Sequence, residues 1–168
     1  MLPVTYAVGA VLLFALLLLG YAAGVHAYRY RRRAQAVLAA ALGRLLQREG
    51  AKVNDSDVFN GRAIALDRRV RKLAWIDAHK PAEEWCLALG EVDTCSLVTT
   101  SDKGAACLSA IFLELQPREG APLRLYFYRE GKDPVREKPS LFRKAKYWKQ
   151  KINLYRVKSA AALNPFPG

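Results

Sequence analysis

An uncharged run of 26 residues, from Leu2 to Ala27, constrains this chain more than any other feature. As an α-helix the run would be about 39 Å long at ~1.5 Å per residue, and a bilayer core needs about 20 apolar residues. Leucines fill its middle, tyrosines lie toward its ends, and nothing basic precedes it except the terminal amine. The run therefore predicts a transmembrane anchor over residues 1–28.

A cluster of four arginines follows this run within five positions: Arg29, Arg31, Arg32 and Arg33. Excess Lys and Arg marks the cytoplasmic side of a span. We therefore expect a single-pass protein of the plasma (inner) membrane, with its N-terminus outside and its C-terminal domain in the cytosol. The three cysteines show no disulfide spacing, which fits a reducing compartment. The alternative is a signal peptide whose cleavage after Ala27 would release an exported soluble protein or enzyme.

Two glycines inside the run, Gly20 and Gly24, have the spacing that lets helices pack closely. The pair is a candidate helix–helix contact and leaves a homo-oligomer open. It also supports an alternative role for the chain, as a small accessory subunit of a larger membrane complex.

Residues 29–58 are expected to form a juxtamembrane helix and a polar connector. Alanine and leucine dominate residues 34–47, and Leu38, Leu42, Leu45 and Leu46 share one helical face. That face needs a cover, which the following domain, a partner helix or the membrane surface could supply. Residues 51–58 are polar and are assigned to the connector.

From residue 59 the hydrophobic period shortens toward two, which is typical of strands. Alternating or β-branched runs occupy residues 62–66, 73–75, 85–89, 92–100, 106–116 and 123–128. Turn residues separate them, and the intervals are too short for crossover helices. The pattern predicts an α+β domain over residues 59–158 with an antiparallel meander of six or seven strands, the seventh within residues 85–100.

One amphipathic helix is expected to close this domain. Its apolar stripe steps by four and three residues and consists of Leu141, Ala145, Trp148, Ile152 and Tyr155. The stripe should pack on the sheet. Residues 159–168 contain two prolines and are expected to be a flexible tail.

The segments Phe59–Asp67 and Arg71–Asp77 are similar to the first hairpin of small bacterial domains of the pleckstrin-homology-like superfold. Several antiparallel strands followed by one C-terminal helix with a central tryptophan also resemble that superfold, over residues 58–157. The resemblance implies a sandwich or barrel of seven strands. It also implies binding of peptides, proteins or lipid headgroups, and rarely catalysis.

The chain carries a net charge of +12, and much of the excess lies at its C-terminal end. Residues 138–168 hold eight basic residues and no acidic one. The basic side chains around the last helix are a candidate face for an acidic partner, with a solvated helix surface as the simpler interpretation. They are Arg143, Lys144, Lys146, Lys149, Lys151 and Arg156. Nucleic acid is not favoured, because a stacking platform or a known binding module is missing.

The sequence contains no pattern typical of catalysis, cofactor binding or a metal site. His79 is the one histidine beyond the uncharged run and lies in a turn sequence, and no phosphate-binding glycine loop occurs. Cys86, Cys95 and Cys107 lack the short spacing of zinc ligands. We therefore predict no enzyme activity and no cofactor. The expected function is a membrane-anchored binding or scaffolding protein whose domain contacts a protein or anionic lipid.

Overall fold

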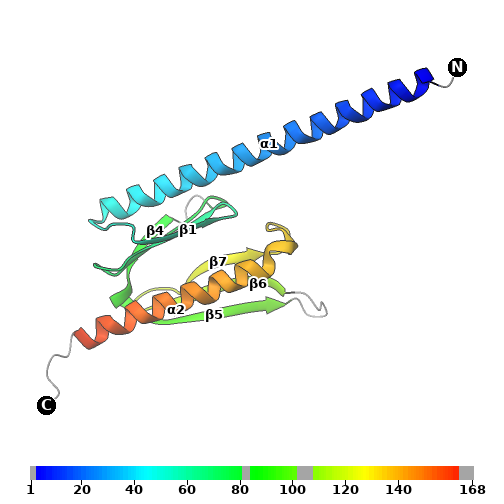
Figure 1. The fold of residues 1–168 in the computed structure, drawn as a ribbon. Helices are drawn as coiled ribbons and strands as arrows, with labels where there is room; N and C mark the ends of the chain where they lie inside the picture. The colour runs from blue at the N-terminus through cyan, green and yellow to red at the C-terminus, as the bar shows by residue number, and fades with distance from the viewer. Residues whose placement is uncertain (1–2, 81–83, 102–107, 163–168) are drawn as a thin grey trace, which may run out of the picture.

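The computed structural model describes residues 3–80, 84–101 and 108–162, and its elements form an α+β fold (Figure 1). Helix α1 spans Pro3–Arg48 and helix α2 spans Lys138–Ala162. The first antiparallel sheet has the order β1-β2-β3-β4, with strands Asp55–Phe59, Arg62–Asp67, Lys72–Asp77 and Glu84–Ala88. The second has the order β5-β6-β7, with strands Val92–Ser101, Leu108–Pro117 and Leu123–Arg129.

The seventh strand lies before residue 60, so its predicted place within residues 85–100 is wrong. It is β1, whose first four residues, 55–58, we assigned to the polar connector. This strand lacks an apolar alternation. Within the described residues it lies at the edge of its sheet and pairs with β2 alone. Its carboxylates instead contact lysines of α2. Residues 85–100 hold β4, the 3-10 turn η1 (Leu89–Glu91) and β5.

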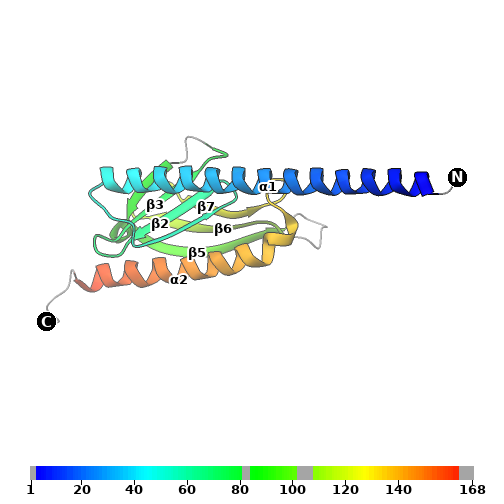
Figure 2. The same cartoon turned by 45° about the horizontal axis from the view of Figure 1, so that its top comes forward.

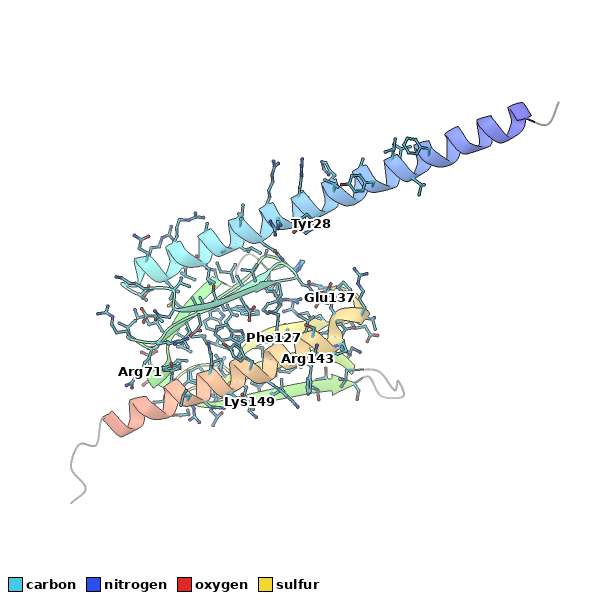
Figure 3. The ribbon with its side chains drawn as sticks, viewed as in Figure 1. Tyr28, Arg71, Phe127, Glu137, Arg143 and Lys149 are labelled. Carbon is cyan, nitrogen blue, oxygen red and sulfur yellow. The ribbon has the colours of Figure 1, made fainter. Side chains whose placement is uncertain are left out.

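The main core lies between the two sheets and α2. Trp75 of β3 and Phe127 of β7 are fully buried there, and Figure 3 shows Phe127 in the interior. Phe59 stacks on Phe127 with ring centroids 5.0 Å apart. The predicted stripe of α2 is buried in the same core, where Trp148 is 1% exposed. Burial of this stripe is what fixes α2 to the sandwich.

A second, smaller core lies on the outer face of the first sheet, beneath α1. Leu42 and Leu46 of α1 are buried there against alanines of β2 and β3. Because these alanines are small, the helix can approach the sheet closely. The first sheet therefore covers the leucine face of residues 38–46. All six residues of β2 are buried, since β2 has the main core on one face and α1 on the other.

The N-terminal half of α1 extends past the sandwich in both cartoon views (Figures 1 and 2). Several large apolar side chains are more than half exposed along it, including Leu17, Leu19 and Tyr21. Figure 3 labels Tyr28 on the same helix, and this side chain is also more than half exposed.

The predicted transmembrane anchor is wrong. No helix of the described residues is both long enough and apolar enough to cross a membrane. After Leu19 the leucines of α1 give way to glycine, alanine, tyrosine and histidine, and arginines begin at Arg29. The placement in the inner membrane and the outward N-terminus depended on that span, and they are wrong with it.

The C-terminal helix is longer than the sequence predicted. Helix α2 continues to Ala162, four residues into the region expected to be a tail. Residues 163–168 lie outside the described residues, as does Cys107.

Candidate functional site

The basic face predicted on α2 is divided between contacts inside the molecule and exposed positions. Lys144 donates to Asp57 at 2.5 Å, and Lys151 donates to Asp55. The indole of Trp148 donates to the second oxygen of Asp57 at 2.9 Å. These bonds join α2 to β1 and close that edge of the first sheet.

On its other side α2 reaches the start of β5. Arg156 donates to the backbone oxygen of Asp93, and the Asn153 amide donates to the backbone oxygen of Cys95 at 3.4 Å. Of the predicted face, Arg143 and Lys146 are exposed and Lys149 is partly buried. Figure 3 labels Arg143 and Lys149 on this helix. The predicted acidic-partner face therefore contains side chains that contact β1 and β5 as well as side chains that are exposed.

The outer edge of β5 is the second surface of interest. Within the described residues, no strand pairs with this edge, because β5 is the outermost strand of its sheet. The carbonyl of Cys95 points away from β6, toward α2. Backbone groups alternate along an antiparallel strand, so the N–H and C=O groups of Leu97 and Thr99 also point outward. Ser96, Val98 and Thr100 then bond to β6.

A buried ion cluster lies at the end of the sandwich that holds the β1–β2 turn. Arg62 is fully buried at the start of β2. Its Nη1 donates to both carboxylate oxygens of Asp133, at 3.0 and 2.9 Å, and its Nε lies 3.5 Å from Asp77 Oδ2. Arg129 Nη2 lies 3.3 Å from the same Asp77 oxygen. Two arginines thus balance two carboxylates, as buried charges require.

The two carboxylates of this cluster also fix two loops. Asp77 ends β3 and accepts the backbone N–H of His79 at 3.0 Å. Asp133 follows β7 and accepts the backbone N–H of Arg129 at 2.6 Å. Arg62 therefore connects residues 78–80 with residues 129–133, which are far apart in sequence.

A pocket with a volume of about 670 Å³ opens between these two loops. Its wall contains three basic side chains, Lys80, Arg129 and Lys132, and one acidic side chain, Glu130. The Arg129 guanidinium lies 3.8 Å from the centroid of the Tyr126 ring, and the Lys80 ammonium lies 6.0 Å from it. These distances are typical of cation–π contacts. The pocket wall therefore combines positively charged side chains with the aromatic ring of Tyr126.

The candidate residues of α1 are exposed, where they are described. A Cβ on Gly20 or Gly24 would meet nothing within 4 Å, so this face is open. Arg29, Arg32 and Arg33 are exposed, and the side chain of Arg31 lies outside the described residues. The topological role predicted for these arginines depended on the span. The structure brings none of these residues to the pocket or to the edge of β5.

The two cysteines that the structure describes are positioned as ordinary thiols. Cys86 is partly buried and Cys95 is buried. Burial raises the pKa of Cys95 to about 11, although the positive charges of Lys149 and Arg156 act to lower it. Among the described residues, no group of three His, Cys, Asp or Glu side chains is placed to hold a metal ion.

Sequence reasoning missed Arg62, Asp77 and Asp133. Each is charged and lies at the end of a strand or in a turn sequence, where exposed charge is the usual expectation. Nothing in the local pattern shows that side chains 71 positions apart meet in the interior.

Comparisons with protein-family models, with curated proteins and with solved structures each found no match.

Proposed function

We propose that this protein is a binding module that recruits a partner protein by adding an extended segment of that partner to the outer edge of β5. In strand addition, backbone hydrogen bonds give affinity and alternate side chains give specificity. The observation that carries the proposal is the ten-residue edge strand with outward backbone groups at Leu97 and Thr99.

The composition of β5 supports this choice among the edges of the two sheets. Exposed edges are usually blunted by charge, by proline or by short length. β7 carries Arg124 and Arg129, β4 has five residues, and the acidic residues of β1 are paired with α2. From Thr94 to Ser101, β5 contains neither a charge nor a proline. It is therefore the edge least protected against pairing.

The class of fold gives further support. Seven antiparallel strands followed by a helix are what the resemblance to pleckstrin-homology-like domains implies, and such domains mostly bind peptides, proteins or lipid headgroups. Fold alone does not fix function. Contact with anionic lipid through α2 is less well supported, because Lys144, Lys151 and Arg156 bond within the molecule.

The test uses proline to remove one outward N–H. Thr99→Pro should leave pairing with β6 intact, since the lost donor faces away from β6. Thr99→Ala is the matched control. Like the proline variant it loses the side-chain hydroxyl, but it keeps the backbone N–H. The probe is a displayed library of random peptides, selected against the full chain.

We expect peptides that bind the wild type and Thr99→Ala equally, and at least tenfold more weakly to Thr99→Pro. Equal binding to all three proteins would refute strand addition at this position. Thermal unfolding of the three proteins shows whether the fold is preserved.

A second candidate role, as an accessory subunit, is favoured by the exposed side chains of α1. Leu17, Leu19 and Tyr21 are 64, 68 and 74% exposed on the helix beyond the sandwich. Leu42 and Leu46 cannot take part in docking, because they are buried against the first sheet. Crosslinking from cysteine introduced at Tyr21 would show a stable neighbour if this role is correct, and none if it is wrong.

A further inference from the structure

We propose that the pocket between residues 78–80 and residues 129–133 binds a phosphate monoester. This site is separate from the outer edge of β5 and does not depend on strand addition. It would give the protein a second ligand, or a modified group on its partner, that strand pairing alone does not explain.

The charge lining the pocket supports an anionic ligand. Lys80 comes from the loop after β3, Arg129 is the last residue of β7, and Lys132 lies in the turn that follows. Among the described residues of the wall, Glu130 is the one acidic side chain that opposes them. A concave surface with an excess of one sign of charge concentrates counter-ions, and the chain as a whole is strongly positive.

The loops are held in place before any ligand arrives. Asp133 fixes the start of its segment through the N–H of Arg129, and Asp77 fixes the turn that presents Lys80. Both carboxylates are held by Arg62, whose side chain is fully buried. The pocket is therefore supported by a rigid charged base, and binding would order little additional chain.

Phosphate suits these donors better than a carboxylate. A phosphate monoester carries nearly two negative charges at neutral pH and offers three acceptor oxygens, so it can meet cations that approach from separate loops. The Arg129 guanidinium contacts Asp77 through Nη2 and stacks on Tyr126, which fixes its plane. The five N–H donors of a guanidinium allow Arg129 to contact more than one acceptor.

The test is a titration of the full chain with inorganic phosphate, followed by NMR at constant ionic strength with chloride as the balancing anion. Lys80→Ala combined with Lys132→Ala removes two exposed cations from the pocket and leaves the buried cluster untouched. Lys52→Ala combined with Lys146→Ala is the matched control, because it removes the same charge from exposed positions elsewhere.

We expect saturable shifts at the amides of Lys80, Ser109 and residues 129–132 in the wild type and the control. The pocket variant should bind at least tenfold more weakly. Shifts that are unsaturable, that are equal in all three proteins, or that lie elsewhere would overturn the proposal. Lys132→Glu is a second variant, and its failure to weaken binding would also overturn it.

Two further arms distinguish the sources of the phosphate. A phosphoserine peptide and a soluble inositol phosphate are titrated beside inorganic phosphate. At least tenfold tighter binding of one of them identifies a phosphorylated protein or a phosphorylated headgroup as the source. Equal affinity for all three would show that the site recognises the phosphate group alone, whatever its source. Binding by none of the three contradicts the proposal.

Discussion

The two sheet edges that face α2 are closed in different ways. At β1, Asp55 and Asp57 form ion pairs with Lys151 and Lys144, and Trp148 adds a hydrogen bond. At β5, among the described side chains, Asn153 and Arg156 of α2 cap the carbonyls of Cys95 and Asp93. The helix therefore closes one edge with charge and covers only the start of the other. The comparison shows how one helix can protect a sandwich and still leave a strand available for pairing.

The largest expected effect comes from removing the buried tryptophan that fixes α2 to the main core and to β1. Trp148→Ala should lower the free energy of unfolding by about 3–5 kcal/mol, because it leaves a cavity and removes the bond to Asp57. Denaturant unfolding measures the loss. Tyr147→Ala is the control on the same helix, since that ring is 47% exposed, and it should cost less than about 1 kcal/mol. Equal losses would mean that α2 is not anchored through Trp148.

A comparison of paired variants should show that α2 binds β1 more strongly than β5. Lys144→Ala with Lys151→Ala breaks two partly buried ion pairs and should cost about 2 kcal/mol. Asn153→Ala with Arg156→Ala removes two caps on β5 carbonyls and should cost about 1 kcal/mol. Calorimetry gives both values. A larger loss of stability from the Asn153 and Arg156 pair of substitutions would contradict the stronger contact between α2 and β1.

The β1 edge should also be the one that responds to acid. The hydrogen bond from Arg68 lowers the pKa of Asp55 to about 2, burial opposes this shift, and Lys151 adds to it. Because the folded pKa lies below the ordinary value of 3.8, ionised Asp55 stabilises the fold above pH 4, and this contribution is lost as the pH falls from about 4 to 2.

Asp55→Asn should therefore cost about 1–2 kcal/mol at pH 7, and the difference from the wild type should shrink below pH 4. Asp93→Asn on β5 is the control. Asp93 and its partner Arg118 are both more than half exposed, so the change should stay within about 0.5 kcal/mol. Urea unfolding at several pH values measures both, and a pH-independent difference would refute the assigned role of Asp55.

The smallest effect is expected at the exposed part of the α2 face. Arg143→Glu with Lys146→Glu should change the free energy of unfolding by less than about 0.5 kcal/mol. Peptide binding at β5 should also be unchanged, since neither residue caps its edge. A stability loss above 1 kcal/mol would show that this face has a structural role.

Much of the sandwich could be predicted from local pattern. The stripe of α2 and the runs that became β2 to β7 follow hydrophobic periods of 3.6 and 2, which burial on one face imposes. β1 could not be found this way, because Asp55, Ser56 and Asp57 are polar. The reason for these residues is the pair of lysines on α2, which only the folded chain brings near.

The candidate sites were less predictable than the fold. The uncharged run led to an expected membrane span that the structure does not support. The basic residues of α2 were found, but their partners on β1 and β5 were not. Arg62 and Asp133 could not be paired from sequence, because no local signal connects the start of β2 with the segment after β7.

Hydrogen exchange at individual amides of β5 tests the central claim most directly. In the free full chain, the amides of Leu97 and Thr99 should exchange rapidly, and those of Ser96, Val98 and Thr100 should be protected by β6. Addition of a selected peptide should protect Leu97 and Thr99 as well. If these two amides are already protected in the free protein, or stay unprotected with the peptide bound, the edge of β5 is not the binding surface.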